Sequence, residues 1–322
     1  MNRSRSARLP VLLAGFGGVA GFLLRLFALL NGTDSSRLLV TGSPWLVLLI
    51  LFAAAITAAL LVLILRGPHV KKGNYRSFAR GTGDLLCGLL GALLVFAGSI
   101  AELLRDASGT GLYLGVGGLL CALLLALAAL QRRLRRPVSF WEVFPVTVWA
   151  AVRLILHFKS WSFDPRVIDF CCRLFADVTA LLALQFLSGF CLKVGRTRAA
   201  VLWCLLAYVF SVASVPDFLL GWGSTLGECL IGLGLGLYCL TCAVQLLNGR
   251  TRVPRPAPAE ESPAEEPPAE ATGEWSGELP PMPTQELPPE QPTEPQTSDE
   301  ELPRRFAPPP APEPTEFPDI TD

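Results

Sequence analysis

Histidine is scarce in this sequence, and its scarcity excludes several groups of enzymes. Only His69 and His157 occur, far apart along the chain. A zinc protease motif needs two histidines four residues apart, and a serine-type triad needs a histidine beside a nucleophile and an acid. The Gly-Lys-Ser/Thr ending of a phosphate-binding loop is also missing. We therefore expect no enzyme activity, no cofactor and no metal site.

Acidic residues are scarce too, but only in residues 1–255. This part carries 25 Lys and Arg against 10 Asp and Glu, whereas residues 256–322 carry 2 against 17. The formal net charge of zero is therefore a cancellation between a basic body and an acidic end. Residues 251–322 contain 20 prolines and almost no apolar side chains, so they cannot bury a core. We predict a disordered, proline-rich acidic tail over 248–322.

Long apolar runs dominate the rest of the chain. A helix that crosses a bilayer needs about 20 mostly apolar residues, and eight runs reach this length. The fifth run is the weakest, because it holds Glu142, Pro145 and Arg153. The sequence predicts an all-α polytopic membrane protein whose transmembrane domain covers 1–247. The expected spans are 9–30, 44–66, 83–104, 110–131, 138–157, 169–192, 199–220 and 225–247.

Loop charges give the expected orientation of these spans. Positive side chains collect in the cytoplasmic loops of membrane proteins. With eight spans, the side of the N-terminus receives 18 Lys and Arg, and the other side receives 4. Without the fifth span, Lys193, Arg196 and Arg198 would move to the other side and weaken this asymmetry. We therefore predict eight spans with the N-terminus and the C-terminus both in the cytoplasm.

Two short motifs have chemical alternatives. Gly81-Thr82-Gly83-Asp84 matches the sequence around a catalytic aspartate of intramembrane aspartyl proteases, but such enzymes need a second aspartate at similar depth. Asp84 more simply begins a helix, where the helix dipole favours an acid. Cys239 and Cys242 have the spacing of a redox pair, but all nine cysteines fall within the predicted spans, where Cys acts as a small hydrophobic residue. We prefer the structural interpretation of both motifs.

The two halves of the membrane domain, spans 1–4 and spans 5–8, resemble each other weakly. The matches fall in the same order in both halves, which favours tandem duplication of a four-helix unit. Chance similarity between leucine- and alanine-rich helices is the alternative. Four spans is an even number, so duplicated halves would be related by an axis along the membrane normal. The longest matches are Leu24-Arg25-Leu26 with Val152-Arg153-Leu154, Leu51-Phe52-Ala53 with Leu174-Phe175-Ala176, and Ser99-Ile100-Ala101-Glu102-Leu103 with Ser214-Val215-Pro216-Asp217-Phe218.

Ionisable side chains inside the predicted spans are the candidates for a functional site. Such residues are costly in a bilayer and by default indicate function. Most of them lie near the predicted outer ends of their helices, and only Arg173 and Asp177 lie deeper. Asp169, Arg173 and Asp177 share one helix face, because they are four residues apart. The candidates are Arg25, Glu102, Arg153, Asp169, Arg173, Asp177, Asp217 and Glu228.

Two interpretations of these charges stay open. In the first they are structural: Arg25 and Arg153 extend to the outer headgroups, the acids pair with them, and Arg173 neutralises Asp177. In the second they line a water-filled cavity for a polar solute or for protons. The second interpretation gives most weight to Asp177, which lies nearest the middle of the bilayer.

The stretch from Gly21 to Ile50 contains Leu24-Arg25-Leu26, Thr33-Asp34 and Ser43-Pro44. It resembles uncharacterised multi-pass membrane proteins of Firmicutes-type bacteria. The resemblance implies a bacterial cell membrane, and it implies no activity and no site residues.

Two functions are compatible with these features. The first is a small-solute permease or another membrane transport component, with the ionisable residues above as its polar site. The second is a membrane scaffold whose tail, residues 256–322, recruits a cytoplasmic protein, because proline-rich segments adopt an extended conformation that groove-bearing partners recognise. The expected partners are the lipid bilayer and, for the scaffold, that protein. The short basic loop 66–80 reflects topology, so no nucleic-acid partner is expected.

Overall fold

The fold is taken from a computed structural model that describes residues 3–32, 43–66, 78–79, 81–106, 109–134, 136, 138–162 and 170–249. All of these residues belong to the first of two compact units, Met1–Glu260. They form helices α1 Arg3–Asn31, α2 Pro44–Arg66, α3 Thr82–Arg105, α4 Gly109–Leu134, α5 Phe140–Ser162, α6 Cys171–Cys191, α7 Thr197–Ala213, α8 Val215–Leu219 and α9 Leu226–Gly249.

Eight stretches of this part of the chain are long and apolar enough to cross a membrane. Their ends agree with the predicted spans to within three residues, so the all-α fold with eight spanning helices is confirmed. The predicted tail over 248–322 lies outside the described residues, apart from two residues that end α9.

The seventh span is two helices rather than the single one predicted over 199–220. Helix α7 ends at Ala213, and the short helix α8 begins at Val215. Pro216 explains the break, because proline has no backbone N–H to donate to the carbonyl four residues earlier. After α8 the chain turns through Gly221 and Gly223, both with a φ of 68°, a backbone conformation that glycine adopts without strain.

Six of the helices close into a ring. Along it, α3 packs on α4, α4 on α5, α5 on α6, α6 on α7, α7 on α9, and α9 back on α3. Helices α6 and α9 also touch each other across the ring. The interior is filled mainly by apolar side chains, among them Val95, Val146 and Leu184, each of which is fully buried. This six-helix ring positions the candidate site.

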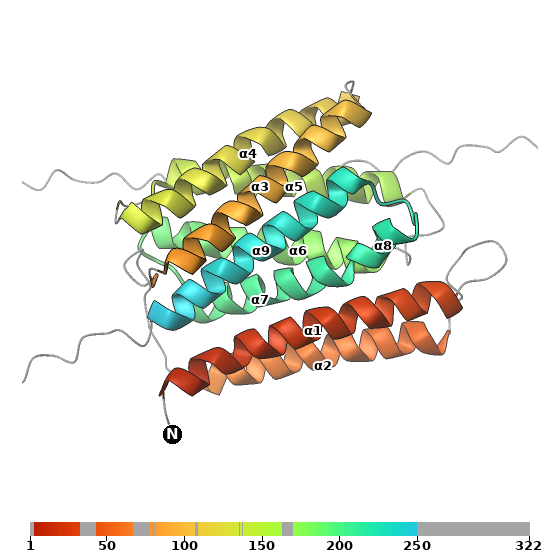
Figure 1. The fold of residues 1–322 in the computed structure, drawn as a ribbon, viewed down its shortest axis with the longest axis horizontal. Helices are drawn as coiled ribbons and strands as arrows, with labels where there is room; N and C mark the ends of the chain where they lie inside the picture. The colour runs from red at the N-terminus through yellow and green to blue at the C-terminus, as the bar shows by residue number, and fades with distance from the viewer. Residues whose placement is uncertain are drawn as a thin grey trace, which may run out of the picture. The chain divides into compact units, whose positions relative to one another are not determined.

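Helices α1 and α2 lie outside the ring as an antiparallel pair. Figure 1 shows this pair in red and orange, next to α7 and on the other side of it from α3 and α4. The first four spans therefore do not form a four-helix bundle of their own, because α1 and α2 pack on α7 whereas α3 and α4 pack on α9 and α5. The two halves of the chain are interleaved, and the duplication stays a prediction from the sequence.

Helices α3 and α9 approach most closely because glycines face each other between them. A Cβ atom at Gly98 would lie 2.6 Å from the carbonyl oxygen of Gly227, and one at Gly234 would lie 2.6 Å from that of Gly91. Small residues at helix interfaces in membranes allow such approach of the two backbones. The contact joins parts of the chain more than 120 residues apart, and it brings the last turn of α3 against the first turn of α9.

Candidate functional site

A cluster of six ionisable side chains lies inside the ring at one of its two ends. Its members come from the last turn of α3, the second half of α5, the first two turns of α6 and the first turn of α9. Five of the six side chains are buried, and Glu228 is mostly buried. We call this set the charge cluster: Glu102, Arg153, His157, Arg173, Asp177 and Glu228.

His157 bridges two carboxylates that belong to different helices. Its Nδ1 atom lies 2.8 Å from Oδ2 of Asp177 on α6, and its Nε2 atom lies 3.4 Å from Oε1 of Glu228 on α9. A neutral imidazole has one N–H and can donate to only one of them, whereas a protonated imidazole can donate to both. The number of helices that His157 links therefore depends on its protonation state.

The two arginines of the cluster pair with different acids. Arg153 on α5 lies 3.3 Å from Asp177, and Arg173 on α6 lies 2.5 Å from Glu228. Arg173 also donates to the Ser224 hydroxyl at 3.3 Å. The cluster thus contains three carboxylates, two guanidinium groups and one imidazole that can change its charge.

Glu228 holds its position because it also closes the beginning of α9. Its carboxylate accepts the backbone N–H of Thr225 at 2.9 Å, and its own backbone N–H donates to the Thr225 hydroxyl at 3.0 Å. This reciprocal pattern is the capping box of helix N-termini, with a Thr and a Glu three residues apart. Local contacts therefore hold the Glu228 side chain in addition to its contacts with Arg173 and His157.

Glu102 joins α3 to the same turn. Its Oε1 atom accepts the Thr225 hydroxyl, and it accepts the backbone N–H of Glu228 at 3.1 Å. Unpaired N–H groups at a helix N-terminus favour an anion. The close glycine contact between α3 and α9 makes this arrangement possible, because Glu102 packs against the Cα of Gly227.

A separate ion pair ties α1 to the short helix α8. Nε of Arg25 donates to Oδ1 of Asp217 at 2.8 Å. The Arg25 side chain is 0% exposed and the Asp217 side chain is 3% exposed. This pair links the outlying α1–α2 helices to the ring at the end where the charge cluster lies.

The structure brings together most of the candidates predicted from the sequence. Five of them lie in the charge cluster, and Arg25 and Asp217 form the separate pair. Asp169 lies outside the described residues. Two expected details are wrong: Arg25 and Arg153 are buried between helices and do not extend to the surface, and Asp177 pairs with Arg153 and His157, whereas Arg173 pairs with Glu228.

His157 is a member of the site that the sequence did not predict. It belongs to no His-based motif and contacts two carboxylates instead. A local signal was present, because His157 follows Arg153 by four residues on the same helix and therefore shares its face.

A second polar centre that the sequence did not predict lies at the opposite end of the ring. Arg132, in the last turn of α4, is buried although its basic loop appeared to be a topology signal. Its guanidinium donates to the Tyr238 hydroxyl at 2.5 Å and to Oε1 of Gln245 at 3.1 Å, both on α9. It also lies over the rings of Phe78 and Tyr238, with distances of 5.6 and 4.9 Å to their centroids. We call these residues, together with Cys242, the Arg132 cluster.

Asp84 lies far from the charge cluster. It is in the first turn of α3, and Glu102 is in the last turn, so the helix rise separates them by about 27 Å. Asp84 and Asp177 are therefore at opposite ends of the ring and cannot share a proton as a catalytic pair. Among the described residues, no group of three or more His, Cys, Asp and Glu side chains is arranged to hold a metal ion.

Large apolar side chains are exposed along the described helices, whereas several charged side chains lie inside. Phe16 is 71% exposed and Leu123 is 66% exposed, whereas Arg25 and Arg153 are buried. This reverses the pattern of water-soluble proteins and suits a hydrocarbon solvent. The chain is an integral membrane protein with several spans. Comparison with protein-family models, curated proteins and solved structures finds no match.

Proposed function

We propose that the chain is a small-solute permease, in which the charge cluster binds the solute or the proton that accompanies it. The observation that carries the proposal is His157 lying between Asp177 and Glu228, inside a ring of membrane helices. Ionisable residues within spans mark substrate and proton pathways in pumps and transporters. We also propose that the protein lies in a bacterial cell membrane with both ends of the chain in the cytoplasm. This part of the proposal rests on the sequence resemblance and on the loop charges.

The charge balance of the cluster supports a role in proton binding. With all three carboxylates ionised, the cluster is neutral when His157 is protonated and has one excess negative charge when His157 is neutral. His157 contacts Asp177 from α6 and Glu228 from α9, and these two acids pair in turn with Arg153 and Arg173. A cationic solute or a second proton can compensate the charge that His157 gives up.

The two polar centres suit a permease that is closed at both ends. The charge cluster occupies one end and the Arg132 cluster the other, and apolar side chains fill the ring between them. A permease closed at both ends needs one barrier on each side, and alternating access opens them in turn. In this proposal the charge cluster belongs to one barrier and the Arg132 cluster to the other.

Proton entry into proteoliposomes tests the proposal. Vesicles that contain a pH-sensitive dye receive an inward proton gradient, and amino acids, sugars, nucleobases and short carboxylates are added as separate classes. We expect one class to accelerate proton entry through the wild-type protein and Asp177→Asn to abolish that acceleration. Arg133→Ala is the control, because Arg133 is an exposed charge next to Arg132.

Two outcomes separate this proposal from its alternatives. Equal solute-dependent flux in the wild type and in Asp177→Asn would contradict a role for the cluster. Removal of residues 256–322 should leave the flux of a permease unchanged. A scaffold that acts through its tail would lose its function in the truncated variant, and neither the wild type nor the truncated variant would show solute-dependent flux.

A further inference from the structure

Arg153 has a hydrogen-bond donor that the charge cluster does not use. The residue is 3% exposed, and its Nη1 atom is buried without an acceptor anywhere in the described part of the chain. A buried polar group without a hydrogen-bond partner costs free energy, so it calls for an explanation. A guanidinium binds anionic oxygens most strongly, and the planar carboxylate matches its fork of donors. Nη1 of Arg153 is therefore a candidate ligand for a carboxylate that does not belong to the chain.

The Arg153 guanidinium is supported by Trp149, one turn earlier on α5. Its Cζ atom lies 5.9 Å from the centroid of the Trp149 ring, within the range of a cation–π contact. The indole N–H donates to the carbonyl oxygen of Leu114 on α4 at 3.3 Å. A Cβ atom at Gly117 of α4 would lie 2.7 Å from the ring, so the absence of a side chain there makes room for the ring. Packing against α4 therefore holds the ring that supports the guanidinium.

Asp177 has two basic partners at different distances. Nδ1 of His157 lies 2.8 Å from its Oδ2 atom, whereas Nη2 of Arg153 lies 3.3 Å from its Oδ1 atom. On its other side the imidazole lies 3.4 Å from Glu228, which Arg173 contacts at 2.5 Å. When His157 is neutral, Arg153 supplies the positive charge that balances Asp177. When His157 is protonated, the imidazolium balances Asp177 at the shorter distance, and the charge of Arg153 can serve a further anion.

The charge count of the cluster favours binding of a carboxylate and a proton together. The third acid, Glu102, accepts the backbone N–H of Glu228 and the Thr225 hydroxyl at the N-terminus of α9, where an anion is favoured. The empty cluster with a neutral His157 has one excess negative charge. A bound carboxylate adds one negative charge and a proton on His157 removes one, so the net charge inside the ring does not change.

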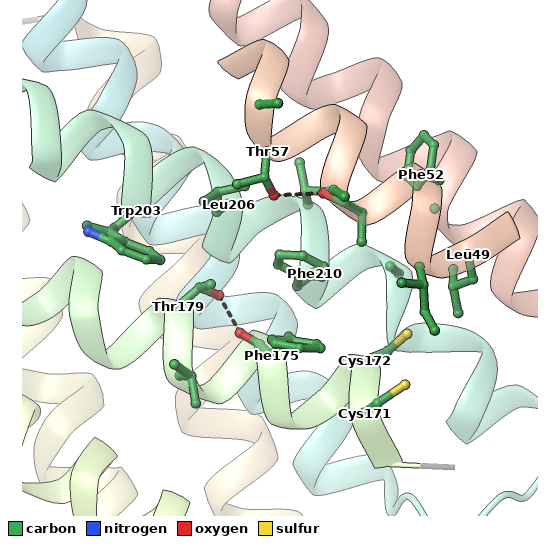
Figure 2. Close-up of a pocket in the computed structure, with 18 of the residues that line it drawn as sticks. Leu49, Phe52, Thr57, Cys171, Cys172, Phe175, Thr179, Trp203, Leu206 and Phe210 are labelled. Carbon is green, nitrogen blue, oxygen red and sulfur yellow. Dashed lines mark hydrogen bonds between the residues drawn. The ribbon is translucent and has the colours of Figure 1, made fainter. Parts of the chain in front are cut away.

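The apolar pocket lined by α2, α6 and α7 offers no comparable site for a carboxylate. Figure 2 shows Thr57 on α2 and Thr179 on α6, whose hydroxyls each donate to a carbonyl oxygen of their own helix at 2.7 Å. The described residues that line this pocket include no charged side chain. A carboxylate would lose its hydration there without compensation. Of the two places, the charge cluster is the one that suits an anion.

We propose that the charge cluster binds the carboxylate group of a small solute, held by Nη1 of Arg153, together with one proton on His157. The proposal rests on the proposed transport function and gives the substrate class of the same site. The proton comes from solvent, so one proton is taken up for each carboxylate bound. Protonated His157 takes over the charge balance of Asp177 and leaves Arg153 to the solute.

Binding to the purified full-length protein in detergent tests the proposal. Acetate, propionate and butyrate are compared with their amides, which have the same shape without the charge, and with alanine, which is a zwitterion. We expect at least one of the three carboxylates to raise the temperature of unfolding, and its amide and alanine to have no effect. Calorimetric titration of that carboxylate, in buffers of different ionisation enthalpy and across the pH range in which histidine titrates, measures proton uptake. The uptake should approach about one proton for each carboxylate at the alkaline end of the range.

Matched substitutions locate the bound carboxylate. Arg153→Lys keeps the positive charge and removes the fork of donors, so the affinity should fall about tenfold, equivalent to about 1.4 kcal/mol. Arg105→Ala removes an exposed arginine at the same end of the ring and should leave the affinity unchanged. Equal affinities in these two variants would overturn the proposal. A loss in Arg132→Ala but not in Arg153→Lys would also overturn it, because the anion would then lie in the Arg132 cluster.

The wild-type protein decides the proposal even where Arg153→Lys fails to fold. Equal effects of a carboxylate and its amide, an effect of alanine alone, no effect of any probe, or binding without proton uptake would each overturn it. Failure of the transport function gives a different pattern. Flux of sugars or nucleobases without carboxylate binding would leave the permease and contradict the carboxylate site. Carboxylate binding with proton uptake but without flux in proteoliposomes would leave the site and contradict the permease.

Discussion

The Arg25–Asp217 pair and the charge cluster are both buried and lie at the same end of the bundle. They differ in whether their charge can be rebalanced after one residue is replaced. The pair holds one charge of each sign at 2.8 Å. The cluster distributes three acids, two arginines and His157 over four helices. Because an imidazole can be neutral or protonated, the cluster contains a group that can adjust its charge when one acid is removed. The pair contains no such adjustable group, which is why we assign it to architecture and the cluster to function.

The largest effect should come from breaking the pair. Arg25→Ala leaves the Asp217 carboxylate buried without its guanidinium, and loss of one partner of a buried ion pair costs about 3–5 kcal/mol. We expect the free energy of unfolding in detergent to fall by that amount. Because α1 contacts α8 through this pair, the α1–α2 helices should also become more accessible to proteolysis.

The double variant Arg25→Met with Asp217→Leu is the control for this prediction. Well-packed apolar residues often replace a buried ion pair without loss of stability, so the double variant should recover most of the lost free energy. A double variant as unstable as Arg25→Ala would show that the instability does not come from the uncompensated charge.

An intermediate effect should follow from Arg132→Ala. Arg132 donates to the neutral side chains of Gln245 and Tyr238 and lies over the Tyr238 ring, so its removal breaks hydrogen bonds and cation–π contacts. We expect a loss of about 2–3 kcal/mol. The neighbouring Arg133 is exposed, and Arg133→Ala should change the free energy of unfolding by less than about 0.5 kcal/mol. Equal losses in the two variants would contradict the burial of Arg132.

The sequence predicts the spans and the rare charges but not how the charges pair. Length and apolar composition alone identify the eight spans, and the cost of charge in a bilayer singles out residues such as Asp177. Partner choice depends on the ring, because Glu102 reaches Glu228 only where glycines let α3 and α9 approach. The two segments in contact are more than 120 residues apart in the chain, so no local sequence pattern predicts that they meet.

Other features carried local signals of different strength. Pro216 indicates the break between α7 and α8, and the Thr225 and Glu228 spacing indicates the beginning of α9. Arg132 carried a misleading signal, because it stands in a run of arginines that fits a cytoplasmic loop equally well. Burial of one member of that run depends on Tyr238 and Gln245, which belong to a distant helix.

The most direct test of the adjustable cluster is the stability of Asp177→Asn, measured beside Arg25→Ala under the same detergent conditions. The asparagine keeps the shape of the side chain. Two acids, Glu102 and Glu228, then remain in the cluster, and with a neutral His157 they are balanced by the two arginines, Arg153 and Arg173. We predict a loss of no more than about 1 kcal/mol, the size of one hydrogen bond. A loss of about 3–5 kcal/mol, equal to that of Arg25→Ala, would show that the cluster is a fixed structural network and would contradict its assignment as a functional site.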